Sequence, residues 1–427
     1  MIDPKILKER PQLLKEMLRR RKIDFPLDEL IELDTKRRQL ISGRQDIRHR
    51  KNVISEQISN KKKEKQDVSA ELSQMKSIGL EMNRSDNAFS TTEDKFNQLM
   101  LSIPNILADS VPDGNDSNDN VVLRTMEGVS KKNFSYLDHV DLCTSLQILD
   151  LERASKVAGA RFYFLKNDLV KLNQALINYA LNFLEENGYN LIQPPFMLKL
   201  DAIKGAVILS DLQDVIYKID QEDMYMIGTS EHAIASMYMG EILDSKDLPL
   251  RYGGLSPCFR KEAGAHGKDT KGIFRVHQFE KVEQFIYCKQ ENSTEEHERM
   301  LMLTEKFYQS LDIPYRVVLL CSAEVGKVAA KTYDIEAWFP GQGAFREIVS
   351  CSNCTDFQAR RLSIRYRDKM DEDTQLVHTL NSTLVATERT MVALIENYQT
   401  NDRGITIPPV LRKYMSDRSE IKFANSS

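Results

Sequence analysis

Between residues 28 and 103 the chain carries apolar residues at seven-residue intervals, contains almost no glycine and has no proline. The apolar positions fall into two series, which are mirror images if the chain folds back between Glu64 and Lys65. Heptad spacing of this kind is typical of coiled coils. The two series are Leu33, Leu40, Ile47 and Ile54, and Met75, Met82, Phe89, Phe96 and Ile103. We therefore predict a long antiparallel α-helical coiled-coil hairpin over residues 28–103, with each arm extending roughly 50 Å.

The pattern changes after the predicted hairpin. Residues 112–120 are rich in turn-forming types, so we expect a linker at 111–120 between an N-terminal domain at 1–110 and a second domain at 121–427. In the second domain, apolar spacing between Asn167 and Gly188 predicts a helix. Strands follow strands at 250–262 and 275–286, which favours an α+β domain with a mainly antiparallel sheet and helices packed on it.

Charge changes the interpretation of the hairpin. Between residues 36 and 65 its first helix carries eleven lysines and arginines against three carboxylates, a composition that would attract a phosphate backbone. A solvated coiled-coil surface gives the same pattern. The eleven cations are Lys36, Arg37, Arg38, Arg44, Arg48, Arg50, Lys51, Lys61, Lys62, Lys63 and Lys65.

Overall composition is that of a soluble protein of more than one domain. The 427 residues include 59 Lys and Arg against 63 Asp and Glu, with 41% hydrophobic and 29% charged residues. No stretch approaches 18 consecutive apolar residues and residues 1–5 lack the apolar core of a signal peptide, so we expect a cytoplasmic protein without a membrane partner. Six scattered cysteines predict reduced thiols.

The predicted strands 250–262 and 275–286 flank a loop, 263–274, rich in glycine and charge. Because side chains alternate along a strand, two arginines, an aromatic ring and two carboxylates would line one surface. These residues are Arg260, Glu262, Arg275, Phe279 and Glu283. Arginine suits phosphate and carboxylate suits ammonium, so the set predicts a site for a nucleotide and an amino acid. A salt-bridge ladder on an exposed sheet face accounts for the same residues.

The sequence Phe259-Arg260-Lys261-Glu262, followed by a loop and residues 275–279, resembles motif 2 of the class II aminoacyl-tRNA synthetases. Further segments resemble the archaeal and eukaryotic seryl-tRNA synthetases in particular, and with the hairpin the resemblance covers nearly the whole chain. These segments are 229–231, 263–272, 278–284, 347–354 and 407–411. The resemblance implies a class II antiparallel sheet flanked by helices. It also implies a ligase that activates L-serine with ATP as seryl-adenylate and transfers it to tRNA(Ser), and to tRNA(Sec) where present.

The resemblance implies how ATP binds. Arg260 would hold the α-phosphate, Glu262 the adenine amino group, Arg275 the γ-phosphate, Phe279 the adenine ring and Arg389 the polyphosphate tail. The implied ATP-binding set is Arg260, Lys261, Glu262, Arg275, Val276, His277, Gln278, Phe279, Glu347, Ile348, Val349, Ser350 and Arg389.

Serine binding and catalysis are implied in the same way. The implied serine-binding set is Thr229, Glu231, Arg260, Glu283, Asn381 and Thr383, and the implied catalytic residues are Arg260, Glu283 and Arg389. The chain departs from the commonest form of motif 3, because the glycines expected near Ser382, Leu384 and Glu388 are absent.

The resemblance implies that Mg²⁺ accompanies ATP at Glu347 and Ser350. A Cys351-x-x-Cys354 pair is also present, but no second pair or nearby histidine completes a zinc-binding pattern, so no zinc is expected.

The implied partners are tRNA and a second copy of the chain. A homodimer would form through residues 189–197, which match the motif 1 position, and the hairpin would bind tRNA. The predicted tRNA-binding residues are Arg37, Arg44, Arg48, Lys51, Lys61, Lys62, Lys63 and Lys65. Two other functions fit the same fold: an enzyme that loads an amino acid onto a carrier protein, and a non-catalytic tRNA-binding paralogue. The long hairpin disfavours the first, and the retained Arg260, Glu283 and Arg389 disfavour the second.

Overall fold

The computed structural model describes residues 1–129, 132–208, 212–262, 271–370 and 372–423. Two compact units are formed, one by Ile2–Arg19 with Ile23–Ile103 and the other by Met1, Arg20–Lys22 and Pro104–Ser427. Most of the predicted loop 263–274, namely 263–270, lies outside the described residues. Among the described helices, none combines the length and apolar composition that crossing a membrane requires.

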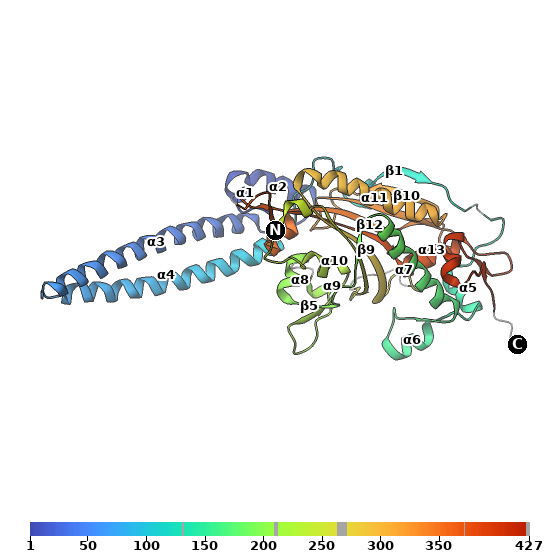
Figure 1. Cartoon of the computed structure of the whole chain (residues 1–427), viewed down its shortest axis with the longest axis horizontal. Coiled ribbons are helices and arrows are strands. Elements are labelled where there is room, and N and C mark those ends of the chain that lie inside the picture. The colour runs from blue at the N-terminus through green and yellow to red at the C-terminus, as the bar shows by residue number, and fades with distance from the viewer. Residues whose placement is uncertain (130–131, 209–211, 263–270, 371, 424–427) are drawn as a thin grey trace. The chain divides into compact units, whose positions relative to one another are not determined.

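The first unit is helical. Short helices α1 (Lys5–Glu9) and α2 (Pro11–Arg20) precede two long antiparallel helices, α3 (Leu27–Lys63) and α4 (Ser69–Ser102), which lie side by side (Figure 1). The predicted coiled-coil hairpin is confirmed, and its turn falls within a few residues of the predicted position.

Apolar contacts along one seam and ion pairs beside it join the two long helices. Ile47 and Phe96 from the predicted heptad series are buried, and the aromatic ring of Phe89 lies 4.3 Å from the Arg44 guanidinium. Carboxylates of α4 pair with cations of α3 along the hairpin. These pairs are Arg37–Glu93, Arg44–Asp86, Arg50–Glu81 and Lys61–Glu71. The basic charge of α3 is thus partly neutralised within the hairpin itself.

The second unit is built on an eight-stranded sheet of order β1-β10-β11-β12-β15-β9-β8-β4. All neighbouring strands are antiparallel except the parallel pair β4–β8. The bounds are β1 Val121–Met126, β4 Asn190–Ile192, β8 Leu250–Phe259, β9 Gln278–Cys288, β10 Tyr315–Leu319, β11 Lys331–Phe339, β12 Ala344–Thr355 and β15 His378–Ala386. The predicted α+β class and mainly antiparallel sheet are confirmed.

Helices cover one face of this sheet and leave part of the other open. Helix α11 (Ser293–Ser310) packs on β9, β12 and β15, where Gln284 of β9 donates a hydrogen bond to Thr304 at 2.8 Å. Helix α7 (Asp168–Glu186) occupies the predicted helical segment and, like α13 (Thr387–Asn397), contributes to the same hydrophobic core. The side chains that precede and follow Gln284 on β9 point to the opposite face, so that face is available for polar groups.

The strands that flank the predicted loop 263–274 are shorter than predicted. Strand β8 ends at Phe259 and β9 begins at Gln278, and one further bond, from the Arg260 N–H to the His277 carbonyl at 2.9 Å, continues their pairing. Glu262 and Arg275 lie beyond it. The backbone N–H of Lys261 donates to Val215 rather than across the hairpin, and Glu262 has a φ of 48° in the left-handed region. The chain therefore turns away from the sheet after Arg260 and before Glu262.

Candidate active site

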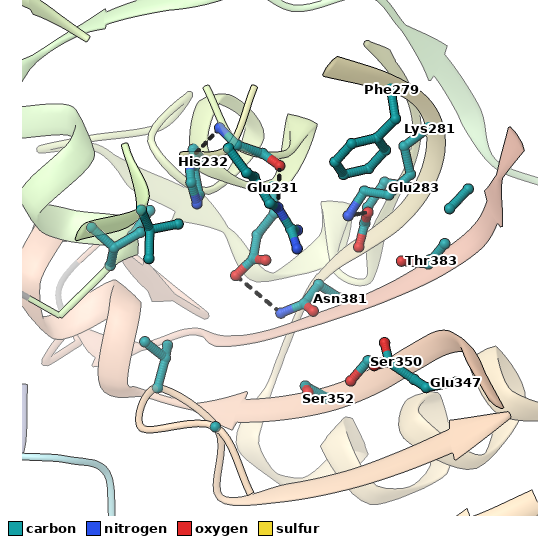
Figure 2. A pocket seen from close by; sticks show the side chains of 18 of the residues that line it. Glu231, His232, Phe279, Lys281, Glu283, Glu347, Ser350, Ser352, Asn381 and Thr383 are labelled. Carbon is teal, nitrogen blue, oxygen red and sulfur yellow. Dashed lines mark hydrogen bonds and ion pairs between the residues drawn. The ribbon is translucent and has the colours of Figure 1, made fainter. Parts of the chain in front are cut away.

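A cavity of about 480 Å³ lies on the open face of the sheet, over β9, β12 and β15 (Figure 2). Phe279, Lys281 and Glu283 come from alternate positions of β9, and Asn381 and Thr383 from alternate positions of β15. Alternate residues of a strand share a face, so regular pairing is enough to bring these five side chains together.

A β-bulge delivers the polar residues of β12. The register between β11 and β12 shifts beside Glu347, and Ile348 is left as an extra residue between the paired positions Glu347 and Val349. Without the shift, Glu347 and Ser350 would point to opposite faces, because they are three positions apart. With it, both line the cavity.

One end of the cavity is acidic and closely hydrogen-bonded. Glu231 lies in the short helix α10 (Ser230–Ala235), and its Oε1 accepts hydrogen bonds from Gln358 Nε2 at 2.8 Å and Asn381 Nδ2 at 3.1 Å. Burial, together with the nearby charge of Glu283, raises the pKa of Glu231 to about 7. These hydrogen bonds orient the Glu231 carboxylate, so it is already positioned to bind an ammonium or hydroxyl group.

A second carboxylate faces the same end. Glu283 is buried and forms an ion pair with the buried ammonium of Lys281. It also accepts a hydrogen bond from Thr229 Oγ1 at 3.3 Å, and Thr229 caps the start of α10. This end therefore offers both charge signs, which suits the ammonium and carboxylate of a free amino acid.

Three arginines line the other end, and two of them are held by carboxylates. Arg275 Nη1 lies 3.0 Å from Glu262 Oε2, and Arg389 Nη1 lies 2.9 Å from Glu347 Oε1. The charge of Arg389 holds the pKa of Glu347 below its usual value. Guanidinium groups bind phosphate in a bidentate manner, so this end suits a polyphosphate.

The third arginine joins the two ends. Arg260 Nε donates to the Gly228 carbonyl at 3.1 Å, and its guanidinium lies 5.2 Å from the centre of the Phe279 ring. The Phe279 ring lies at the border of the cavity (Figure 2). A nucleobase beside Phe279 and a phosphate at Arg260 would fit one continuous ligand.

Most of the predicted site residues meet in this one cavity. Those that line it are Glu231, Arg260, Glu262, Arg275, Val276, Phe279, Glu283, Glu347, Ile348, Ser350, Asn381, Thr383 and Arg389. Thr229 contributes to the site indirectly, through its hydrogen bond to Glu283. The lining, as far as the described residues define it, does not include Lys261, His277, Gln278 or Val349.

These outlying residues have other surroundings. His277 Nδ1 lies 3.0 Å from the Tyr217 hydroxyl and 2.9 Å from the Arg260 carbonyl, so it supports the backbone that carries Arg260. Val349 packs in the core on the helix side of the sheet, and Gln278 is exposed. Roles in ATP binding for these positions stay predictions.

Several lining residues were not predicted. Strand alternation alone would have included Lys281, which lies between Phe279 and Glu283. His232, Gln358 and Glu388 come from helices or helix ends distant in sequence, and residues 326–329 come from the loop between β10 and β11. No sequence pattern marks these contributions, because they arise only from the tertiary arrangement.

The two cysteines of the CxxC pair face different surroundings. Cys351 packs in the main core, whereas Cys354 lines the cavity and its sulfur accepts a hydrogen bond from Asn381 Nδ2 at 3.5 Å. All six cysteines are free thiols. Within the described ranges, no group of three or more His, Cys, Asp or Glu side chains is arranged to hold a metal ion.

The oxygens near Glu347 suit a magnesium ion that arrives with ATP. Ser350 pairs in register with Asp334 of β11, and the buried Asp334 Oδ1 has no hydrogen-bond partner among the described residues. Mg²⁺ prefers oxygen ligands and usually takes only one or two from the protein, with phosphate and water supplying the rest. The donor set therefore fits Mg²⁺.

The structure divides the predicted tRNA-binding cations of the hairpin into two groups. Arg37, Arg44 and Lys61 are paired with carboxylates of α4. The others are exposed, and in the described chain no carboxylate pairs with them. This second group consists of Arg48, Lys51, Lys62, Lys63 and Lys65.

Two domain families match the chain. Residues 216–398 match the tRNA synthetase class II core domain (G, H, P, S and T), and residues 1–107 match the seryl-tRNA synthetase N-terminal domain. The antiparallel sheet with its cavity is thus that of a class II tRNA synthetase.

Full-length relatives define the family within this class. The chain is 54% identical to the serine–tRNA ligase of Nitrosopumilus maritimus over 99% of this chain and 100% of that protein. It is similar to the crystal structure of seryl-tRNA synthetase from Pyrococcus horikoshii complexed with ATP, with a TM-score of 0.92, 44% identity and complete coverage of both chains. The cytoplasmic serine–tRNA ligase of Naegleria fowleri in complex with AMP matches with a TM-score of 0.86 and 36% identity, covering 100% of this chain and 99% of that one. The chain belongs to the seryl-tRNA synthetase family, as the resemblance predicted.

Proposed function

We propose that this protein is a serine–tRNA ligase, which activates L-serine with ATP and transfers the seryl group to tRNA(Ser). The observation that carries the proposal is a single cavity with an amino-acid end at Glu231 and Glu283 and a phosphate end at three arginines. Relatives at 45–54% identity over nearly the whole chain are serine–tRNA ligases, which supports serine as the amino acid.

Activation requires positioning and charge neutralisation rather than a protein nucleophile. An oxygen of the serine carboxylate attacks the α-phosphorus of ATP, and the bond to the leaving pyrophosphate breaks. Arg260 would neutralise charge on the α-phosphate, while Arg275 and Arg389 would bind the polyphosphate. Bound together with ATP at Glu347 and Ser350, Mg²⁺ would supply further neutralisation of phosphate charge.

Transfer uses the same cavity. The 3′-terminal ribose hydroxyl of tRNA attacks the carbonyl carbon of seryl-adenylate, an ester forms, and AMP leaves with the electron pair of the broken bond. We infer that tRNA is held by the exposed cations of the hairpin, through backbone contacts that recognise shape. The chain would then be organised as a tRNA-binding domain at 1–110, a linker at 111–120 and a catalytic domain at 121–427.

Selectivity for serine would depend on polar groups at the acidic end. Alanine lacks the hydroxyl, so it could not form the additional hydrogen bond that a serine hydroxyl would make to Asn381 or Glu231, and sites built around such a bond discriminate strongly. Threonine adds a methyl group, which would have to fit beside Thr383 in the cavity wall.

We also propose a homodimer that forms through residues 189–197. This segment includes the edge strand β4 and exposes Leu191 and Met197, whose side chains are 42% and 47% accessible. Light scattering on the purified protein would show twice the chain mass. We place the protein in the cytoplasm, where free thiols persist and charged tRNA is used.

Pyrophosphate exchange with each amino acid in turn, followed by charging of total tRNA with the preferred one, tests the proposed function. We expect serine-dependent exchange and a seryl-tRNA product. Preference for threonine or alanine would refute the substrate assignment. Exchange with serine without any tRNA product would favour a carrier-protein ligase.

A further inference from the structure

The helical hairpin is joined to the rest of the chain through two short segments that belong to the compact unit of the active site. One segment is Arg20–Lys22 and the other begins at Pro104. Both contact the loop that connects β10 to β11, and six successive carbonyls of this loop, at residues 325–330, accept hydrogen bonds from them. We call residues 325–330 the pocket loop.

Arg21 supplies three of these contacts. Its side chain is only 3% exposed, and its guanidinium donates to the carbonyls of Val325 at 2.8 Å, Gly326 at 3.3 Å and Ala329 at 2.5 Å. Its Nε donates to the carbonyl of Asn105 at 2.9 Å, so it also binds the second segment. The planar guanidinium with its five N–H donors is the side chain best suited to bind several carbonyls at once.

The second segment completes the set. The Asn105 backbone N–H donates to the Lys327 carbonyl at 2.7 Å, and its Nδ2 donates to the Val328 carbonyl at 2.9 Å. The Ala108 N–H donates to the Ala330 carbonyl at 2.9 Å. Every carbonyl of the pocket loop is therefore bound by a residue that lies next to the hairpin in the sequence.

The pocket loop forms part of the cavity wall, because residues 326–329 all line it. Asn105 Nδ2 also donates to the Cys354 carbonyl at 2.9 Å, and the Cys354 sulfur accepts a hydrogen bond from Asn381. Asn381 in turn donates to Glu231 at the amino-acid end. A continuous chain of contacts thus runs from the base of the hairpin to the groups proposed to bind serine, and it does not pass through the arginines of the phosphate end.

The Arg21 guanidinium is a buried cation that is bound only by backbone carbonyls. Removing such a charge from water costs free energy, and this cost is offset only if every N–H donor is hydrogen-bonded. Loops are otherwise the most mobile parts of a fold. The presence of a buried arginine here is explained if Arg21 holds the pocket loop in one particular conformation.

We propose that Arg21 and Asn105 are positioning residues that set the amino-acid end of the cavity through the pocket loop and make serine binding sensitive to tRNA bound at the hairpin. The proposal rests on the proposed function, since it assumes that serine occupies this end.

Steady-state pyrophosphate exchange by the full-length protein, with and without tRNA, tests the proposal. For Arg21→Gln we expect the KM for serine to rise about tenfold, because several hydrogen bonds to the loop are lost, while the KM for ATP changes less than about twofold. In the unaltered protein tRNA should shift the KM for serine, and in the variant this shift should disappear.

Arg20→Gln is the matched control. Arg20 is the neighbouring arginine, but its guanidinium binds Asp113 and the Val111 carbonyl instead of the pocket loop. The control should keep the serine KM and its response to tRNA. Equal changes in Arg20→Gln and Arg21→Gln, or a parallel rise of both KM values in Arg21→Gln, would overturn the proposal.

Asn105→Asp keeps the test decisive if Arg21→Gln does not fold. The substitution preserves size but replaces the donor to the Val328 and Cys354 carbonyls with an oxygen, so it should raise the serine KM in the same selective way. An unchanged serine KM in this variant, or no effect of tRNA on the serine KM of the unaltered protein, would contradict the proposal. Absence of serine-dependent exchange in the unaltered protein would instead refute the proposed function.

Discussion

The division of the hairpin cations into paired and unpaired groups makes a quantitative prediction for tRNA binding. Lys62, Lys63 and Lys65 lie at the tip, are exposed, and have no carboxylate partner in the described chain. Replacing all three with alanine would remove three potential phosphate contacts. Each contact releases about 0.7 to 0.9 counterions, so the slope of log affinity against log salt should become shallower by about 2 to 3.

The assay is equilibrium binding of tRNA(Ser), measured by filter retention at salt concentrations from about 50 to about 200 mM. A control variant carries Gln at Arg37, Arg44 and Lys61, whose charges are already balanced by α4 carboxylates. This control should alter the slope much less, and serine-dependent pyrophosphate exchange should be unchanged in the tip variant. Equal slopes in the unaltered protein and the tip variant, or equal effects of the two triple substitutions, would refute the reasoning.

Three further predictions concern the cavity. Burial raises the pKa of Glu388 to about 7, so the folded protein retains a proton that the unfolded chain releases near its ordinary pKa of 4.5. The contribution of the Glu388 carboxyl to the free energy of unfolding is complete at low pH and falls by about 3 kcal/mol as the pH rises to 7. The Glu388→Gln variant should lack this pH dependence. Thermal midpoints that fall equally with pH in the variant and the unaltered protein would contradict the prediction. Phe279→Ala should raise the KM for ATP about tenfold by removing a stacking surface, with little change in the KM for serine; a larger effect on serine would place the base elsewhere. Asn381→Ala removes a donor to Glu231 and should lower the serine-over-alanine ratio of kcat/KM about tenfold or more; an unchanged ratio would exclude Asn381 from selectivity.

Regular periodicities explain which features could be predicted from the sequence. The hairpin was predictable because each heptad position repeats a contact that is local along the helix, so Ile47 and Phe96 could be assigned to the seam. Strand alternation likewise placed Phe279 and Glu283 on one face. The family was predicted from motif resemblance, because hydrophobic periodicity carries no information about family membership.

Irregular backbone and distant contacts explain what could not be predicted. The ends of β8 and β9 depend on where the backbone leaves the ladder, which for Lys261 is set by Val215, a residue remote in sequence. The lining residue Gln358 reaches Glu231 from a separate helix, and its spacing to the other site residues follows no period. The role of Arg21 is invisible in sequence because its partners are backbone carbonyls, which any residue type provides.

The bulge at Ile348 constrains the length of β12 as well as its composition. Deleting Ile348 would leave Glu347 and Ser350 two positions apart, so regular pairing with β11 would keep both side chains on the cavity face, with Glu347 beside Arg389. Straightening the bulge without a deletion would instead shift one flank of β12 by one residue and reverse the orientation of every side chain on that flank. The extra residue and the bulge must therefore be gained or lost together during evolution.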